Sequence, residues 1–101
     1  MQIKSAVKKN NLYVGLVGEL DQSSVQTIKL SFNEIFEKNK YRNVVFDMSQ
    51  LSFMDSTGIG LILSRYKKLR KENVPVYITS PNAQIDKIIR VSGLYTIMPL
   101  L

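Results

Sequence analysis

Cysteine and histidine, two residue types that carry much of the chemistry of active sites, are absent from this chain of 101 residues. Without cysteine, neither a disulfide framework nor a thiolate metal site can form. Without histidine, the commonest general base and the commonest zinc ligand are missing as well. The composition therefore argues against the most familiar kinds of hydrolase and zinc protein.

Long apolar runs are also absent. A helix that crosses a bilayer needs about 20 apolar residues, and polar residues interrupt every apolar stretch well before that. Met1–Val7 has no apolar core of the kind found in signal peptides. No linker, repeat or low-complexity segment divides the chain, and 45% of its residues are hydrophobic. The sequence predicts one domain spanning residues 1–101, located in the cytoplasm.

Negative charge is in short supply, with 8 acidic residues against 14 lysines and arginines and a net charge of +6. This balance is compatible with an anionic partner such as nucleic acid or an acidic protein surface. A solvated surface is the simpler interpretation. The basic run Arg65–Lys71 falls at the predicted end of a helix, where cations interact favourably with the helix dipole. We therefore favour a solvated helix face over a nucleic-acid patch.

The first part of the chain predicts a β-hairpin followed by a helix. Gln2–Val7 and Leu12–Val17 are rich in strand-forming residues, and the turn between them contains two asparagines. Asp21 is placed to cap the helix that follows, because its carboxylate can accept hydrogen bonds from first-turn amides. The apolar stripe of this helix is Val25, Ile28, Phe32, Ile35 and Phe36.

The rest of the chain alternates strands and helices. Asn43–Met48 and Pro75–Thr79 predict buried strands, and each is followed by an amphipathic helix. The apolar segment Tyr95–Leu101 predicts a short terminal strand. The alternation implies parallel crossovers. The predicted fold is a single α/β domain that opens with a β-hairpin and has a mixed, mostly parallel sheet of about five strands with helices packed on it.

One segment has unusual local chemistry, Phe53–Gly60, at the junction between a buried strand and a helix. The free amides and the positive dipole end of a helix N-terminus favour an anion, so the hydroxyl of Ser56 suits a phosphate. Gly58 and Gly60 keep the surface low enough for another protein's active site to approach. The alternative interpretation is a Ser/Thr helix cap with two glycines for close packing, and the residues alone favour that alternative.

Three other functional motifs do not match the sequence. A dinucleotide fingerprint that starts at Gly58 needs a third glycine where Leu63 stands. A nucleophile elbow around Ser56 needs glycine where Met54 stands, and no P-loop sequence occurs. Since no acid–base constellation is visible, the sequence predicts neither an enzyme nor a cofactor. Three aspartates are too scattered to predict a metal site: Asp21, Asp47 and Asp55.

These segments resemble a known family, the STAS domains, and in particular the bacterial anti-sigma-factor antagonists of the sporulation type. Gly18–Asp21 is similar to the family motif at the end of the second strand. Phe53–Gly60 is similar to its phosphorylation-site motif, and Ile62–Lys67 continues the match along the second helix. The order of strands and helices also fits, so the resemblance covers essentially the whole chain.

The resemblance implies a partner-switching module. Unphosphorylated, such a protein binds an anti-sigma factor that is also a serine kinase, and so frees the sigma factor. The kinase uses ATP to phosphorylate the serine that corresponds to Ser56, and a metal-dependent serine phosphatase reverses the step. ATP and Mg²⁺ belong to the kinase, and neither nucleic acid nor a membrane is contacted directly. Further residues match positions at or near the family's binding surface: Asp21, Asp55, Thr57, Gly58 and Gly60.

Three alternatives remain open from the sequence. The chain could serve as a STAS subunit of a stress-sensing or transporter complex. It could instead be a basic nucleic-acid-binding domain that uses Lys67, Lys68, Arg70 and Lys71. Thr57 directly follows Ser56, so it is a second candidate phosphoacceptor.

Overall fold

A hairpin opens the chain, as predicted. The computed structural model describes residues 1–101, and in it β1 (Gln2–Lys8) pairs antiparallel with β2 (Asn11–Leu20). Lys9 and Asn10 form the turn with positive φ angles of 50° and 68°. Tight two-residue hairpin turns require this left-handed geometry, which asparagine tolerates well.

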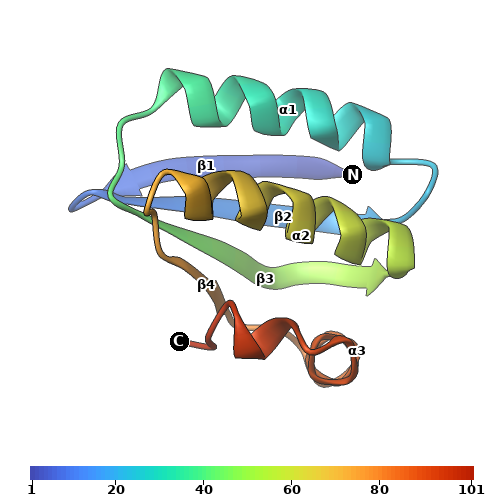
Figure 1. Cartoon of the computed structure of the whole chain (residues 1–101). Coiled ribbons are helices and arrows are strands. Elements are labelled where there is room, and N and C mark those ends of the chain that lie inside the picture. Colours follow the sequence, from blue (N-terminus) through green and yellow to red (C-terminus); the bar gives the residue numbers. More distant parts are fainter.

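The remaining strands are parallel because a helix returns the chain to the same end of the sheet before each of them. β3 (Asn43–Met54) pairs with β2, and β4 (Val76–Thr79) pairs with β3. The sheet therefore has the order β1-β2-β3-β4, with one antiparallel edge (Figure 1).

Three helices pack on the sheet and enclose a single hydrophobic core with it. They are α1 (Val25–Lys38), α2 (Ser56–Lys71) and α3 (Ala83–Ser92), and α1 and α2 run along the sheet in Figure 1. No polar or charged residue is buried in the protein. The helices bury these residues in the same cluster as the strands: Ile28, Phe32, Phe36, Leu61, Ile62, Leu69, Ile85 and Ile89.

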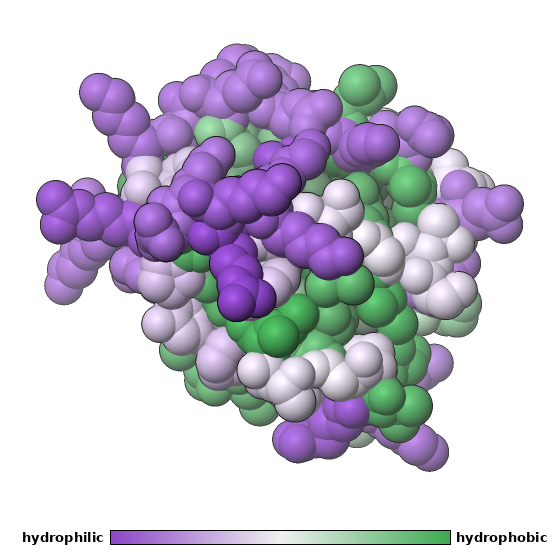
Figure 2. Space-filling model, in the orientation of Figure 1, coloured by the Kyte–Doolittle hydropathy of each residue, from purple (hydrophilic) through white to green (hydrophobic).

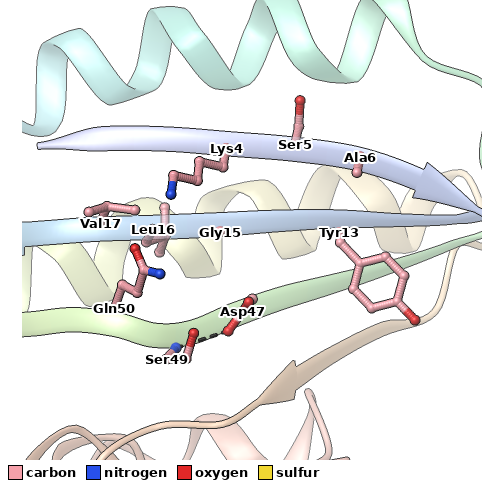
Figure 3. Close-up of a pocket in the computed structure, with 10 residues that line it drawn as sticks. All are labelled: Lys4, Ser5, Ala6, Tyr13, Gly15, Leu16, Val17, Asp47, Ser49 and Gln50. Atoms are coloured by element: carbon pink, nitrogen blue, oxygen red, sulfur yellow. Dashed lines mark hydrogen bonds between the residues drawn. The ribbon is translucent and has the colours of Figure 1, made fainter.

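Alternation along the strands separates the two faces of the sheet. Leu12, Val14 and Leu16 of β2 are fully buried against the helices. The residues between them, Tyr13 and Gly15, are only half-buried and lie on the opposite face. No helix covers that face, and it contains a hollow of about 190 Å³ (Figure 3).

The prediction of about five strands is wrong, because the sheet has four. The segment predicted as a terminal strand, Tyr95–Leu101, instead begins within η1 (Leu94–Thr96), a turn of 3₁₀ helix, and is not a strand of the sheet. Leu94 and Met98 are both buried at this helical spacing, and the amide of Met98 donates to the carbonyl of Leu94 at 2.8 Å. Only Leu100 forms a bridge to β4. The apolar residues of this segment therefore enter the core from a helical turn rather than from a strand.

Several strand and helix boundaries also differ from the predicted ones. β2 continues to Leu20 and β3 to Met54, beyond the predicted ends at Val17 and Met48. The pairing of these two strands has two irregularities in register, between Gly15 and Val17 and between Gly18 and Glu19, and it continues beyond both to Leu20 and Met54. α1 begins at Val25 rather than directly after Asp21.

A small polar cluster joins the end of the chain to α3. The carboxylate of Asp86 accepts hydrogen bonds from Tyr95 Oη at 2.6 Å and from Arg90 Nε at 2.9 Å. The Tyr95 hydroxyl, followed by Arg90, lowers the pKa of Asp86 below its ordinary value of 3.8. Burial and the hydrogen bond to Asp86 raise the pKa of Tyr95 to about 12.

We expect Tyr95→Phe to raise the pKa of Asp86, which a carboxyl-carbon NMR titration would measure. A carboxylate whose folded pKa is depressed stabilises the fold above its unfolded pKa, and this contribution is lost as pH falls through the folded value. The stability difference between wild type and Tyr95→Phe should thus be present at neutral pH and shrink below pH 3.8. An unchanged Asp86 pKa in the variant would contradict this coupling.

Candidate phosphorylation and partner-binding site

The candidate site lies where two parallel strands end side by side. Leu20 and Met54 are partners in the register of β2 and β3, and the loops after them lead into α1 and α2. The amide of Asp55 donates to the carbonyl of Leu20 at 3.3 Å. Segments far apart in the sequence therefore meet at one end of the sheet, on the right of Figure 1.

Asp55 joins the two loops and starts α2. Its Oδ1 accepts a hydrogen bond from the amide of Gly58 at 3.0 Å, which makes it the cap of the helix. Its Oδ2 accepts from the amide of Gln22 at 3.2 Å, across 33 residues of sequence. One carboxylate therefore fixes both the helix start and the position of the neighbouring loop.

Ser56 is the first residue of α2 rather than its cap. Because Asp55 performs the capping, the hydroxyls of Ser56 and Thr57 make no hydrogen bond within the protein, and both residues are exposed. The interpretation of Ser56 as a capping residue, which the sequence alone favoured, is therefore wrong. Its hydroxyl is free to react or to contact a partner.

Asp21 shapes the turn before α1 rather than the helix itself. Its Oδ1 accepts from the amides of Ser23 and Ser24 at 3.0 and 3.1 Å and from the Ser23 hydroxyl at 2.6 Å. The Ser23 hydroxyl is the main cause of a lowered pKa at Asp21. The predicted helix cap is thus a turn stabiliser a few residues upstream, and its Oδ2 makes no hydrogen bond within the protein.

We expect Asp21→Asn to affect partner binding more than folding. Asparagine keeps an oxygen that can accept from Ser23 and Ser24, so the turn is retained while one negative charge is lost. Thermal unfolding should change little, whereas calorimetric titration with the partner should show a clear change in affinity. A large loss of thermal stability would assign Asp21 a purely structural role.

The two glycines of the motif have different environments. A Cβ at Gly58 would lie 2.5 Å from the carbonyl oxygen of Leu20 and 2.9 Å from Met54 Cγ, so no side chain fits there. A Cβ at Gly60 would meet no atom within 4 Å. Gly58 is buried and is required for the close approach of α2 to the strands, so the prediction that it keeps the outer surface low is wrong. Gly60 is exposed and leaves the outer surface low.

The charge of this surface is negative although the protein is basic. The loop segments 18–24 and 52–60 contain Glu19, Asp21 and Asp55 and no lysine or arginine. Both ion pairs of the protein lie elsewhere, at Glu34–Lys38 and Asp86–Arg90. A phosphate on Ser56 would therefore increase an existing negative charge without a basic residue of the same loops to neutralise it.

Sequence reasoning did not anticipate several features of the site. The roles of the Gln22 amide and the Leu20 carbonyl depend on backbone groups, which leave no mark in the sequence. Phe53, at the end of β3, has 39% of its surface exposed. The sequence placed Phe53 at the start of the motif but did not predict that its ring is exposed. Gly18 adopts a φ of 105°, a conformation that favours glycine.

Of the three aspartates, only Asp47 lies away from the candidate site, whereas Asp21 and Asp55 follow the paired strand ends Leu20 and Met54. Asp47 lies on the uncovered face of the sheet, where its Oδ1 accepts from the amide of Ser49 at 2.9 Å (Figure 3). No group of three acidic side chains is arranged to hold a metal ion. The main hollows of the surface are lined by residues other than Asp21, Asp55 and Ser56. The candidate site is thus an open surface suited to a protein partner rather than a pocket for a small molecule.

Comparison with known sequences identifies one family over nearly the whole chain. Residues 2–101 match the family described as STAS domain. An anti-sigma F factor antagonist from Paenibacillus polymyxa is 30% identical over 100 residues, which covers 99% of this chain and 86% of that protein. Another from Lysinibacillus sphaericus is 28% identical, with 87% and 75% covered. An anti-sigma-B factor antagonist from Staphylococcus aureus is 24% identical, with 97% and 90% covered.

Solved structures agree with this assignment. The anti-sigma factor antagonist SpoIIAA in its unphosphorylated form matches with a TM-score of 0.80 at 26% identity, covering 99% of this chain and 88% of that chain. The phosphorylated form of SpoIIAA from Bacillus matches with a TM-score of 0.72, again at 26% identity, with 99% and 91% covered. None of the helices in the present structure combines the length and apolarity needed to cross a membrane.

Proposed function

Since the chain belongs to the STAS domain family and is related along its length to anti-sigma F factor antagonists, we propose that it is an anti-sigma factor antagonist switched at Ser56. One observation supports the proposal above the others. Asp55 caps α2, so the exposed hydroxyl of Ser56 in the first helical turn is left without an internal partner. A kinase can therefore reach this oxygen without breaking a hydrogen bond of the fold.

The unphosphorylated surface suits a protein partner. It combines the exposed ring of Phe53, the free oxygen of Asp21 and the open backbone at Gly60. Apolar contacts of this kind at the centre of an interface, surrounded by polar groups, are typical of protein recognition. The partner in this proposal is an anti-sigma factor, which releases its sigma factor when the antagonist binds.

Phosphorylation reverses binding through charge. A phosphate adds about −1.5 to −2 charges and three strong acceptors. Beside Asp55 and Asp21 this charge repels a partner that also carries nucleotide phosphates, and removing it from water in an interface is costly. About 4 kcal/mol of differential affinity corresponds to a thousandfold change in binding. The proposal requires one phosphate on Ser56 to change the affinity by about this amount.

The proposal assigns the chemistry to two other proteins. The anti-sigma factor acts as a serine kinase, which transfers the γ-phosphoryl group of ATP to Ser56 Oγ and releases ADP. A serine phosphatase hydrolyses the phosphoserine and restores the hydroxyl. The chain itself contributes the acceptor oxygen and the surface around it, and it acts neither as an enzyme nor with a cofactor of its own. The proposal therefore locates the chain in the cytoplasm, together with these two proteins.

The relatives favour sporulation over general stress as the signal. Two relatives named for sigma F are 30% and 28% identical to this chain, and one named for sigma B is 24% identical. Calorimetric titration of the unphosphorylated chain into each purified anti-sigma factor of the source organism tests this proposal. Tight binding to the sigma F type, with release of sigma F, is expected. If the chain binds none of these anti-sigma factors, the alternative that it is a STAS subunit of another assembly would be favoured.

A further inference from the structure

A groove runs along α2 at the end remote from Ser56. Five α2 residues line it at spacings of three, one, three and one, which place them on one face of the helix. Ile97 of the C-terminal segment forms the opposite wall, and the groove has a volume of about 570 Å³. The α2 residues are Leu63, Tyr66, Lys67, Arg70 and Lys71.

The groove continues into a second hollow of about 390 Å³ beside β4. The two hollows share Tyr66, Arg70 and Ile97, so they form one continuous surface. Their floor is largely apolar, while their only charged residues are cations and no carboxylate lines them. In Figure 2, which has the orientation of Figure 1, a hydrophobic area lies near the centre of the visible surface, directly below strongly hydrophilic side chains. The second hollow adds these apolar residues: Val74, Pro75, Val76, Tyr77 and Pro99.

Positive charge is concentrated at the same end of the molecule. The β1–β2 turn and the C-terminal ends of α1 and α2 meet there, on the left of Figure 1. Segments 8–10, 38–42 and 67–71 carry nine of the 14 lysines and arginines. Three acidic residues lie beside these segments, Glu34, Glu37 and Glu72, and Glu34 pairs with Lys38, so this end keeps a positive net charge. The Ser56 end is acidic, so the protein has two poles of opposite charge. A negatively charged partner is drawn to the groove end and repelled from the Ser56 end.

We propose that this groove binds an acidic peptide segment that inserts an aliphatic or aromatic side chain between α2 and Ile97. This inference goes beyond the proposed function at Ser56, because it concerns a second binding surface. With a rise of about 1.5 Å per residue, Arg70 lies roughly 20 Å from Ser56 along the helix. The near end of the groove, at Leu63, lies about 10 Å from Ser56 along the helix. A phosphate on Ser56 therefore does not touch the cationic rim, and we expect the two surfaces to be occupied independently.

The shape of the floor favours a peptide over a nucleic acid. Sequence-tolerant binding of single strands uses exposed aromatic rings on which bases stack. The floor here consists mainly of aliphatic side chains and prolines, and its two aromatic residues, Tyr66 and Tyr77, are both half-buried. An apolar side chain flanked by carboxylates matches both the aliphatic floor and the cationic rim formed by Lys67, Arg70 and Lys71.

Fluorescence anisotropy with a labelled synthetic peptide, Asp-Glu-Asp-Phe-Leu-Asp-Glu-Asp, tests the proposal on the full chain. We expect saturable binding, and the double variant Arg70→Glu/Lys71→Glu should weaken it by at least about tenfold. Ile97→Ala should also weaken binding while leaving the charge unchanged. Phosphorylation of Ser56 should leave the affinity unaltered, and circular dichroism should confirm that each variant is folded.

The matched control is Lys8→Glu/Lys40→Glu, which makes the same change of charge at the same end but outside the groove. It should reduce binding far less than Arg70→Glu/Lys71→Glu. The proposal is overturned if the control loses equal affinity, if a peptide with serines in place of Phe-Leu binds as well, or if no binding is detected. Tighter binding of an oligo-dT strand, lost in the same groove variants, would instead identify a nucleic-acid surface.

Discussion

Replacing Ser56 by aspartate is expected to weaken binding to the anti-sigma kinase by roughly tenfold to a hundredfold. The variant places a permanent charge on an exposed position that has no internal partner, next to the carboxylate of Asp55. Aspartate carries one charge and two acceptor oxygens, whereas a phosphate carries nearly two charges and three, so the effect should be smaller than that of phosphorylation. Calorimetric titration with the purified kinase measures the difference.

Ser56→Ala and Thr57→Ala are the matched controls for this substitution. Both hydroxyls are free in the structure, so neither change removes a hydrogen bond of the fold. Ser56→Ala should bind the kinase with nearly wild-type affinity and resist phosphorylation, whereas Thr57→Ala should still accept phosphate. Undiminished affinity of Ser56→Asp would contradict the charge mechanism. Phosphate uptake by Ser56→Ala would transfer the switch to Thr57.

Gly58→Ala is expected to destabilise the fold by about 2–3 kcal/mol, the upper part of the range for overpacking. The added methyl group would lie 2.5 Å from the carbonyl oxygen of Leu20. A backbone carbonyl cannot rotate away, and this one also accepts a hydrogen bond from the amide of Asp55. Relief of the contact would thus displace the junction that positions Ser56. Thermal unfolding should show a midpoint lower by roughly 10 °C or more.

Gly60→Ala separates this steric effect from the general effect of glycine in a helix. A Cβ at Gly60 meets no atom within 4 Å, and alanine is favoured over glycine in a helix by up to about 1 kcal/mol. The variant should therefore be as stable as wild type or slightly more stable. If it nevertheless binds the kinase less well, the low surface at Gly60 serves the interface. Equal destabilisation of both variants would contradict the packing account of Gly58.

The sequence predicted elements well where apolar periodicity was strong. The stripe of α1 and the buried run at the start of β3 were both identified, because their residues face one core. Boundaries were less predictable where polar residues continue a strand, as in β3 beyond Met48. The prediction of a terminal strand was wrong because an apolar segment with no clear period can enter a core from a strand or from a turn. There, Leu94 and Met98 do so from a helical turn.

For the candidate site, the sequence indicated the segment but not its internal geometry. Asp55, Ser56 and the glycines were singled out from residue types and a family resemblance. Which residue caps α2 depends on backbone angles, and the structure assigns the cap to Asp55. The contact from Asp55 to the Gln22 amide depends on two strands ending together, which a single sequence does not encode locally. The groove on α2 likewise requires the folded position of Ile97.

Phosphosite mapping by mass spectrometry, after incubation with the sigma F anti-sigma kinase and ATP, tests the central claim most directly. We predict a single phosphate, located on Ser56, together with loss of binding to the kinase. The absence of phosphate on Ser56, with the kinase shown to be active on another substrate, would contradict the proposed switch.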